Sequence, residues 1–484
     1  MTSLWNSVTK KTTNFSSLKG NIKADIVIIG AGMAGILTAY LLQKKGYSCV
    51  ILEAEKIGEG QTHHTTAKLT VQHGLIYQKL LDLFSLELGR QYYEANLLGL
   101  KKYQEIIQDK KIDCDFTQCP SFLYSLKNAE LLEKEFAAAQ QLGIDAFLTT
   151  DTELPFPIAQ ALTFNNQAHF NPLKFLYALA DDLKIYEHSK VVDVDDNEVI
   201  TETGKVRAQQ IVFACHYPFI NIPGYYFALL HQERSYVLAV KNAIKFQGIY
   251  LGIDADGLSF RSYKDFLLIG GGSHRTGENS AGGKYRILEE TVHKYWPQAS
   301  IISSWSAQDC ISIDGLPYIG QFASSKPNWY VATGFNKWGM TTSMVAAMLI
   351  SELIQNGKSP YEEVFSPQRF AVSASAKSLI KDVGQSVKGL SRRFLEPPRA
   401  MVENLPCGHG GIVEVEGEKV GVYKDEQGQI FVISPKCPHL GCQLEWNPDE
   451  KSWDCPCHGS RFDYYGNLID NPAQENLLVK NYQY

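Results

Sequence analysis

Cysteine and histidine residues crowd into one short stretch near the end of the chain. Four of the ten cysteines lie within residues 437–457. Two motifs stand out there: Cys437-Pro438-His439, which reads C-x-H, and Cys455-Pro456-Cys457-His458, which contains C-x2-H. Thiolates and imidazoles are the side chains that bind iron, zinc and copper. The spacing therefore predicts a metal centre held by two sulfur and two nitrogen ligands.

This ligand set suits a Rieske-type [2Fe–2S] cluster, in which two thiolates hold one iron and two imidazoles hold the other. We expect Cys437 and Cys455 to supply the sulfur ligands and His439 and His458 the nitrogen ligands. A structural zinc site is the alternative. Cys2His2 zinc sites usually pair C-x2-C with H-x3–5-H, so the spacing favours the iron–sulfur cluster.

The two stretches that carry these ligands, residues 437–442 and 455–460, resemble the Rieske proteins of respiratory and photosynthetic cytochrome bc complexes. The resemblance implies a disulfide between Cys442 and Cys457 that joins the two cluster loops. It also implies that the Ser460 hydroxyl donates a hydrogen bond to a cluster sulfur and raises the reduction potential.

Phe462 departs from this family pattern, because high-potential members have a tyrosine there. Phenylalanine cannot donate the hydrogen bond that the tyrosine hydroxyl makes. We therefore expect a potential below that of the respiratory proteins, within the broad Rieske range of about −150 to +300 mV.

A glycine-rich turn near the start of the chain has the spacing of a dinucleotide-binding fingerprint. Gly30, Gly32 and Gly35 form GxGxxG. The first glycine makes the tight turn, the second lets the backbone approach a pyrophosphate at a helix N-terminus, and the third allows close helix packing. The turn thus predicts a dinucleotide cofactor.

The elements around this turn make the fingerprint specific. The β-branched run at residues 25–29 predicts a buried strand, residues 36–45 have helical spacing, and a second strand at 48–52 ends next to Glu53. Glu53 can accept hydrogen bonds from ribose hydroxyls and would repel a 2′-phosphate. A glycine-rich turn in an unrelated α/β domain is the alternative, and this context disfavours it.

Residues 22–370 resemble the D-amino-acid oxidase and glycine oxidase superfamily of flavoproteins. Besides the fingerprint, the matching pieces are residues 65–68, 171–173, 211–214, 314–320 and 332–341. The resemblance implies that the cofactor is FAD and that the helix after Gly339 points its N-terminus at the flavin. Besides Gly30, Gly32, Gly35 and Glu53, it implies FAD contacts at Thr66, Lys68, Ala214, Gly315, Gly334, Phe335, Gly339 and Met340.

No second GxGxxG is present for a nicotinamide cofactor. The glycines at 270–272 follow a predicted strand but open no helix, so we expect a turn there. The electrons therefore come from an organic substrate, which the resemblance implies is a small amine or amino acid.

Substrate contacts are expected from the inserted sheet, where an arginine could hold a carboxylate with two hydrogen bonds. The candidates are Arg234, Tyr236, Arg261, Tyr263, His274 and Arg275. Among possible catalytic residues we expect His274 and Lys337 to lie near the flavin.

Three further residues could serve the flavin. Cys310 is a candidate for a covalent flavin link, as in some sarcosine oxidase relatives, although a buried free cysteine is the favoured interpretation. His63 and His64 are expected to cap or line the FAD site and not to bind a metal.

The chain is expected to be α/β, with an FAD-binding Rossmann-like domain and an inserted α+β substrate domain, plus a small all-β Rieske domain. The predicted division is an N-terminal extension (1–21), the oxidoreductase (22–370), a linker helix (371–399) and the Rieske domain (400–484). The inserted pieces are predicted at about 86–165 and 221–305.

Local patterns support this division. Residues 209–214 and 329–332 predict further strands of the nucleotide-binding sheet, and 236–240, 248–251 and 266–269 predict strands of a second sheet. Residues 86–162 are mostly helical in pattern. Residues 410–432 alternate apolar and polar side chains, which predicts antiparallel strands.

Composition excludes several function classes. The net charge is −6, which gives no basic surface for nucleic acid. The apolar window at residues 340–354 is interrupted by polar residues and falls short of the about 20 residues that a membrane span needs, so a buried helix is predicted. Residues 1–20 lack the apolar core of a secretory signal, and we expect a cytoplasmic protein. Residues 371–399 contain more basic than acidic residues. We interpret this excess as a solvated helix face and not as a docking or membrane surface.

Three functions follow from these motifs. The favoured one is an FAD-dependent dehydrogenase or oxidase of a small amine or amino acid, with the Rieske cluster passing electrons to a protein, quinone or O2. The alternative is an electron-transfer relay between protein partners with no metabolite substrate, and the third is a redox sensor. A Rieske oxygenase is disfavoured because no 2-His-1-carboxylate motif is found.

Overall fold

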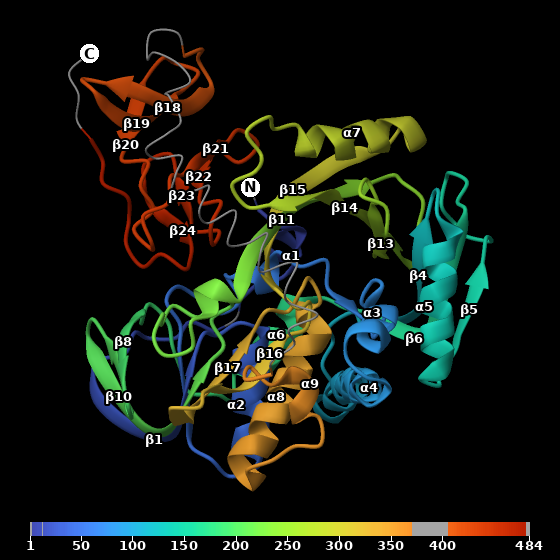
Figure 1. Cartoon of the computed structure of the whole chain (residues 1–484), viewed down its shortest axis with the longest axis horizontal. Helices are drawn as coiled ribbons and strands as arrows, with labels where there is room; N and C mark the ends of the chain where they lie inside the picture. The colour runs from blue at the N-terminus through green and yellow to red at the C-terminus, as the bar shows by residue number, and fades with distance from the viewer. Residues whose placement is uncertain (1, 12, 370–404, 481–484) are drawn as a thin grey trace.

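In the computed structural model, residues 2–11, 13–369 and 405–480 are described, and the predicted linker helix at 371–399 lies outside them. Figure 1 shows the C-terminal strands, in orange and red, beside β11, β15 and α7 at one end of the molecule. The rest of the chain forms two large sheets with helices packed on them.

The first sheet carries the glycine-rich turn. In spatial order its strands are β16 (Tyr318–Ala323), β17 (Lys326–Thr333), β10 (Gly204–Phe213), β1 (Gly20–Ile29), β2 (Cys49–Leu52) and β7 (Ile185–Tyr186), with β8 (Val191–Asp195) and β9 (Glu198–Thr201) beside β10. The central pairs β17–β10, β10–β1 and β1–β2 are parallel, and the last four residues of β1 are buried, as expected for β-branched residues covered on both faces. The helices α2 (Met33–Lys44) and α8 (Gly339–Asn356) pack against each other beside this sheet.

The second sheet is assembled from distant pieces of the chain. Its order is β15 (Ser300–Ser312), β11 (Leu230–Lys241), β14 (Phe266–Arg275), β13 (Ser259–Tyr263), β12 (Ile249–Gly252), β4 (Thr117–Ser125), β6 (Gln160–His169) and β3 (Lys68–Leu69), with β5 (Ala146–Thr149) on β6. Helices α5 (Ala129–Gln141) and α7 (Lys284–Tyr295) pack on this sheet. Helix α3 (Ile76–Leu83) packs on α5, and α4 (Leu86–Lys110) packs on α3 and α8. Because β12 pairs with β4 in parallel, one sheet joins both pieces of the chain.

Two sequence-based expectations are wrong here. Residues 86–162 are not mostly helical, because β4, β5 and the start of β6 lie among the helices. The glycines at 270–272 lie inside β14 and not in a turn. Neighbouring groups leave no room for a side chain at these positions. A Cβ on Gly271 would lie 2.4 Å from Leu258 Cδ2, and one on Gly270 would lie 2.7 Å from Ser259 Oγ.

Three short helices complete the N-terminal part: α1 (Leu4–Val8), α6 (Pro172–Ala180) and α9 (Glu362–Phe365). Single turns of 3-10 helix lie at Gln61–His63 and Tyr226–Ala228. The predicted motif at 171–173 is the start of α6, where the Asn171 side chain accepts hydrogen bonds from the backbone N–H groups of Leu173 and Lys174, both at 3.1 Å. This cap and the following proline explain why the helix begins there.

The C-terminal part is all β. One sheet contains β18 (His409–Val415), β19 (Glu418–Lys424) and β20 (Ile430–Ile433), and the other contains β21 (Glu445–Asn447), β22 (Ser452–Asp454), β23 (Arg461–Asp463) and β24 (Leu468–Asp470). Both are antiparallel, which confirms the prediction from residues 410–432. The expected combination of α/β and all-β parts is confirmed as well.

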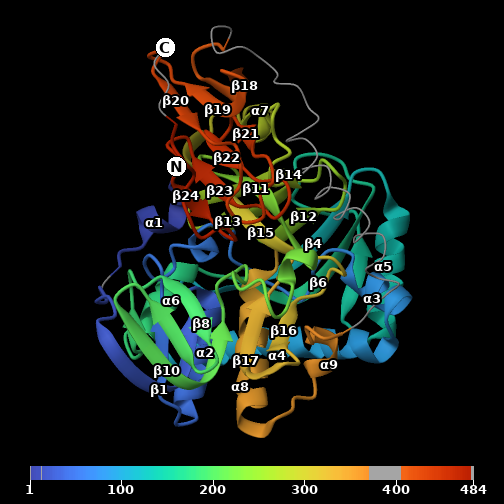
Figure 2. The ribbon, with the colours of Figure 1, turned by 60° about the vertical axis from the view of Figure 1, so that its left-hand side comes forward.

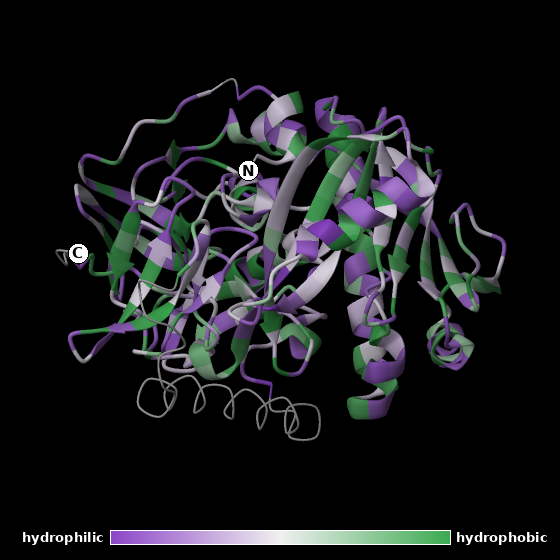
Figure 3. Cartoon of the chain, turned by 90° about the horizontal axis from the view of Figure 1, so that it is seen from above, coloured by the Kyte–Doolittle hydropathy of each residue, from purple (hydrophilic) through white to green (hydrophobic). Residues whose placement is uncertain are grey.

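No described helix combines the length and the apolar character that crossing a bilayer requires. In Figure 3 the helices carry hydrophilic residues among hydrophobic ones. The window at 340–354 belongs to α8, most of which is buried, as predicted.

Candidate cofactor sites

A cavity of about 620 Å³ lies at the carboxyl ends of β1 and β10. Of the residues expected to contact FAD, those on its wall are Gly30, Gly32, Glu53, Thr66, Lys68, Ala214, Gly334, Phe335, Gly339 and Met340. Gly35 and Gly315 are not on the wall. Gly35 packs beneath the turn, where a Cβ would lie 1.9 Å from the Gly30 carbonyl oxygen, and Gly315 lies against Lys79.

The glycine-rich turn fits a pyrophosphate. Gly30 has a φ of +105°, and a Cβ there would lie 2.6 Å from the carbonyl oxygen of Ala214. At the next glycine, Gly32, a Cβ would lie 3.2 Å from Thr62 Oγ1, the atom that accepts the Met33 N–H at 3.0 Å. Helix α2 begins at this point, so its partial positive charge faces the cavity.

Glu53 is held for binding at the other end of the turn. One carboxylate oxygen accepts the Ala31 N–H at 2.7 Å and the other accepts the Glu55 N–H at 3.0 Å. Burial raises the pKa of Glu53, and these backbone donors partly offset that effect. Each oxygen still has a lone pair for a ribose hydroxyl.

Two buried cations lie where the loop at 65–68 meets the cavity. Lys68 is on the wall, and its Nζ lies 3.1 Å from Thr66 Oγ1. Arg261 is fully buried behind it: its Nε donates to the Thr66 carbonyl, and its Nη2 has no hydrogen-bond partner in the described part of the chain. Burial first, and then Arg261, lower the pKa of Lys68 to about 7, with no described carboxylate acting against them.

The N-terminal helix α1 supports this loop. The Trp5 indole N–H donates to the Thr65 carbonyl at 2.7 Å, and the Arg261 guanidinium lies over the Trp5 ring at 5.2 Å. The residues before the first strand therefore help to position the cavity wall, which their polar composition did not indicate.

The two expected catalytic residues behave differently. Lys337 is on the cavity wall, where its ammonium pairs with Glu233 at 2.7 Å and with the Ser273 hydroxyl. His274 is not on the wall. Ser273 is, and neighbouring residues of a strand face opposite sides. The His274 ring instead stacks on Tyr236, with ring centroids 5.7 Å apart.

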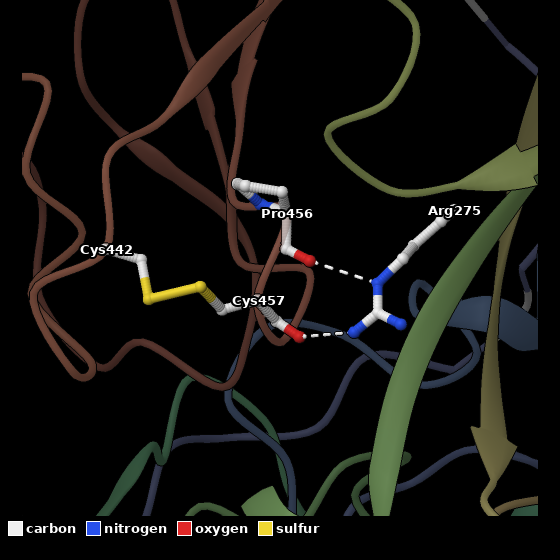
Figure 4. The surroundings of a disulfide bond; sticks show 4 residues. All are labelled: Arg275, Cys442, Pro456 and Cys457. Atoms are coloured by element: carbon white, nitrogen blue, oxygen red, sulfur yellow. Dashed lines mark hydrogen bonds between the residues drawn. A yellow bond between two sulfur atoms is a disulfide. The ribbon is translucent and has the colours of Figure 1, made fainter. Parts of the chain in front are cut away.

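Two of the candidate arginines turn toward the Rieske domain and not toward the cavity. Arg234 pairs with Glu450, with Nη2 and Oε1 2.5 Å apart. Arg275 donates Nε to the Pro456 carbonyl at 3.1 Å and Nη2 to the Cys457 carbonyl at 3.0 Å (Figure 4). Neither is placed to clamp a substrate carboxylate.

Cys310 and His64 line the cavity, whereas His63 does not. Burial raises the pKa of the Cys310 thiol to about 12, and its Sγ lies 3.6 Å from Thr333 Oγ1. Burial also lowers the pKa of His64 to about 3, so its ring is neutral near pH 7. Tyr236, another substrate candidate, is on the wall, but Tyr263 is not.

The four expected cluster ligands lie on two loops that are joined by a disulfide. Cys437 and Cys455 are buried free thiols, and a hydrogen bond from Cys455 lowers the pKa of Cys437. The rings of His439 and His458 lie 4.9 Å apart at 86°. The two thiols therefore lie together and the two imidazoles lie together, which is the pairing that a Rieske cluster requires.

The hydrogen bonding of His439 fits iron binding. Its Nε2 lies 3.1 Å from Asn221 Oδ1, and since an amide oxygen only accepts, the proton sits on Nε2. Nδ1 is then unprotonated, and it is buried with no hydrogen-bond partner among the described residues. An orphaned buried nitrogen is costly unless a ligand such as a metal uses its lone pair.

A disulfide joins Cys442 to Cys457, the pair implied by the resemblance. Figure 4 shows Arg275 reaching the loop just beyond it. The bond removes these two cysteines as metal ligands, which leaves Cys437 and Cys455 for iron.

A buried ionic network joins the Rieske domain to the second sheet. Glu450 lies between Arg234 and Arg461, at 2.5 and 3.1 Å. Burial alone would raise the pKa of Glu450, but the two guanidinium groups lower it to about 2. Arg461 also pairs with Asp454 at 3.1 Å and Asp470 at 2.9 Å. Sequence reasoning missed this network because Arg234 lies more than 200 residues from the other members.

Two buried glutamines bring the second cluster loop onto β11 and β15. Gln232 donates to the His458 carbonyl at 3.0 Å, and Gln308 donates to the Gly459 carbonyl at 2.9 Å. A Cβ on Gly459 would lie 2.5 Å from Gln232 Cβ. Gln232 pairs in register with Cys310 on the cavity wall, so the cavity and the cluster loop share these two strands.

Comparison with known families agrees with both sites. The family model of the DAO type, described as FAD dependent oxidoreductase, matches residues 25–353, and the model of the Rieske [2Fe-2S] domain matches residues 398–483. The chain belongs to the DAO family of FAD-dependent oxidoreductases. This DAO-family chain carries a Rieske domain at its C-terminal end, and its cofactors are FAD and a [2Fe–2S] cluster.

Among curated relatives, the putative Rieske 2Fe-2S iron-sulfur protein YhfW of Bacillus subtilis is 37% identical over 96% of this chain and 94% of its own length. Gamma-glutamylputrescine oxidoreductase of Escherichia coli is 23% identical over 71% of this chain and 87% of its own. The cytochrome b6-f complex iron-sulfur subunit of a Synechococcus strain is 31% identical over 25% of this chain and 65% of its own. The first of these relatives matches both parts of the DAO-family chain.

Solved structures share the fold of the flavin part. Glycine oxidase from Geobacillus kaustophilus aligns with a TM-score of 0.61 and 20% identity, over 72% of this chain and 99% of its own. L-proline dehydrogenase from P. horikoshii also aligns with a TM-score of 0.61, at 17% identity, over 73% and 98%. At these identities the likeness concerns the fold alone.

Proposed function

We propose that this DAO-family protein oxidises a small amino acid or amine and passes the electrons through its Rieske cluster to an acceptor, which is a protein, a quinone or O2. When bound, FAD supplies a two-electron acceptor and the cluster a one-electron carrier. Relatives named for glycine, proline and γ-glutamylputrescine support this class of substrate. The chain's own task is then to bind and orient a small nitrogen compound.

We assign the cofactor contacts from the site geometry. The cluster ligands are Cys437, His439, Cys455 and His458. The FAD contacts are Gly30, Gly32, Glu53, Thr66, Lys68, Ala214, Gly334, Phe335, Gly339 and Met340, with Gly35 and Gly315 in supporting positions.

The buried cations Lys68 and Arg261 support an amino acid over a simple amine. A buried charge without a counter-ion is costly, and neither cation has a carboxylate partner among the described residues. A substrate carboxylate in the cavity would supply the missing charge. Lys337 needs none, because Glu233 already pairs with it at 2.7 Å.

An anaerobic panel tests this function. The oxidised protein is mixed with amino acids and with matched amines that lack the carboxylate, while flavin bleaching and the EPR signal of the reduced cluster are followed. We expect bleaching by amino acids, followed by the cluster signal. Bleaching only by a reduced protein carrier would instead identify an electron-transfer relay. If neither bleaches the flavin, the redox-sensor function would be favoured.

Because Lys68 is also assigned as an FAD contact, Lys68→Met tests the carboxylate contact when it is compared with wild-type protein at equal FAD occupancy. Loss of a buried charge partner costs 2 kcal/mol or more, or roughly 30-fold in affinity, so the KM of the best amino acid should rise by about that factor. Lys68→Arg keeps the charge and should restore most of the affinity. An unchanged KM in Lys68→Met would remove the carboxylate from the proposal.

A further inference from the structure

The Rieske domain contributes a wall to the cavity that carries the glycine-rich turn. Its wall residues are Leu468, Ile469, Asp470, Asn471, Ala473 and Gln474. The segment begins at β24 and contacts β11, where Gln232 Nε2 donates to the Asn471 carbonyl at 2.8 Å; Figure 2 shows the C-terminal strands in this region of the molecule. The cavity is therefore enclosed by two domains, although the dinucleotide fingerprint lies entirely in one.

The segment is held against the part of the cavity where the adenosine half of a dinucleotide belongs. The Asn471 side chain donates to the carbonyls of Cys215 at 3.3 Å and Tyr217 at 3.0 Å. Cys215 directly follows Ala214 and lies against Gly30, where a Cβ would be 3.1 Å from Cys215 Cα.

Two further contacts extend this cover in both directions. Gln61 Nε2 donates to Asp470 Oδ1 at 3.2 Å, next to Thr62, which receives the first N–H of α2. Lys190 donates to the Gln474 carbonyl at 2.5 Å. Lys190 follows Ser189, whose N–H binds the Glu53 carbonyl at 2.8 Å. Residues 468–474 thus extend from the glycine-rich turn, where the pyrophosphate is expected, to Glu53, which is expected to bind the ribose.

The apolar side chain of Ile469, in this segment, is exposed to solvent. Ile469 is 49% exposed although it lies on the cavity wall. An apolar group beside a cavity gains free energy when a flat ring removes it from water.

The same segment is tied to the cluster loop. The Ser460 hydroxyl accepts the Ala473 N–H at 3.0 Å, and Arg461 pairs with Asp470 at 2.9 Å. The cluster loop and this cavity wall are therefore held by shared contacts, through which docking of one can bias the position of the other.

We propose that residues 468–474 are part of the FAD-binding site. They cover the adenosine half of FAD, so that FAD leaves only when the Rieske domain undocks, and bound FAD in turn keeps the Rieske domain docked. This inference rests on the FAD cofactor and not on the substrate, so it stands or falls separately from the proposed oxidation.

Asn471→Ala in the full-length holoenzyme tests the proposal. Loss of two partly buried hydrogen bonds should speed FAD release by about tenfold, measured as the rise in flavin fluorescence after dilution. Iron and sulfide are quantified in the same sample to show that the cluster is retained. The matched control is Glu426→Gln, which breaks an exposed ion pair with Lys451 in the same domain and should release FAD at the wild-type rate. Wild-type release from Asn471→Ala would overturn the proposal.

Amide hydrogen exchange on the wild-type protein gives a test that needs no variant. Removal of FAD should increase exchange in residues 468–474 and leave strand β19 (Glu418–Lys424) unchanged. Equal protection of 468–474 with and without FAD would overturn the proposal.

Discussion

The cluster site and the flavin cavity are assembled in different ways. The four predicted cluster ligands lie within residues 437–458, on two loops joined by one disulfide. The cavity wall comes from both large sheets, from α2 and α8, and from the Rieske domain. A site made from two adjacent loops is readable from spacing, whereas a site made from many distant segments depends on which side of each strand faces inward.

This difference predicts how well each site should tolerate the substitution of a single residue. At the cluster, we expect each proposed ligand to be needed, because no neighbouring side chain would replace it. At the cavity and the interface, several groups share each task, so single substitutions should have graded effects.

The largest effect is expected from Cys455→Ser. A serine hydroxyl does not replace a thiolate on iron, so iron and labile sulfide should fall to a small fraction of the wild-type content. The control is Cys49→Ser, since Cys49 is a half-buried free cysteine at the start of β2. Wild-type iron content in Cys455→Ser would show that the ligand set is different.

Glu450→Gln should destabilise docking of the Rieske domain by about 3 kcal/mol, because it leaves two buried guanidinium groups short of a counter-charge. Urea unfolding followed by cluster absorbance and by flavin fluorescence measures the change for each domain. Glu426→Gln, at an exposed pair, should cost less than about 1 kcal/mol. Equal effects of the two variants would show that the network does not fasten the domains.

Acid should undo the same contact. The pKa of Glu450 is about 2 when docked, against an ordinary value of 4.5. A lowered pKa stabilises the docked form above pH 4.5, and this contribution of about 3 kcal/mol is lost as the pH falls toward 2. The free energies of unfolding of the wild-type protein and of Glu450→Gln, measured between pH 6 and 3, should converge as the pH falls. A constant difference between them would contradict the assignment.

A pH effect of the opposite sign is expected at the substrate end of the cavity. The pKa of Lys68 is about 7, because burial and Arg261 disfavour its charge. Carboxylate binding needs the charged form, so the affinity for a carboxylate inhibitor should fall by up to about tenfold for each pH unit above 7. The shift of the flavin absorption band reports binding, and Lys68→Met should show no such slope.

The smallest effect is expected from Phe462→Tyr. Phe462 is buried in the cluster domain, and a tyrosine hydroxyl there could donate to the cluster or a ligand sulfur. One hydrogen bond of about 1 kcal/mol corresponds to a rise of about 40 mV in a one-electron potential. Potentiometric titration by EPR measures the shift, and a lower potential in the variant would contradict the family-based reasoning.

Prediction from sequence succeeded where the determinants are local. The run at 25–29, the glycine turn and the apolar window at 340–354 each became the expected element, because period and turn chemistry fix them over a few residues. It failed at β4, a nine-residue strand that contains Pro120 and shifts register against β6 at that point. It also failed at the glycines of β14, where close neighbours and not a turn require glycine.

The candidate site shows the same limit. Arg234 and Arg275 have the chemistry of a carboxylate clamp, but their partners are Glu450 and backbone carbonyls of the other domain. His274 has the chemistry of an acid or base, but strand alternation turns it away from the cavity. Residue type predicted what these groups could do, and only tertiary packing decides what they meet.

The two cluster histidines differ in what surrounds them. His458 is 5% exposed and lies under Phe227 and the Gln232 side chain, whereas His439 is half-buried and contacts Asn221 through its outer nitrogen. Among the described residues, His439 is therefore the more accessible of the two imidazoles for a redox partner arriving from solution. The surface around His439 would then govern which electron-transfer partner can bind close to the cluster.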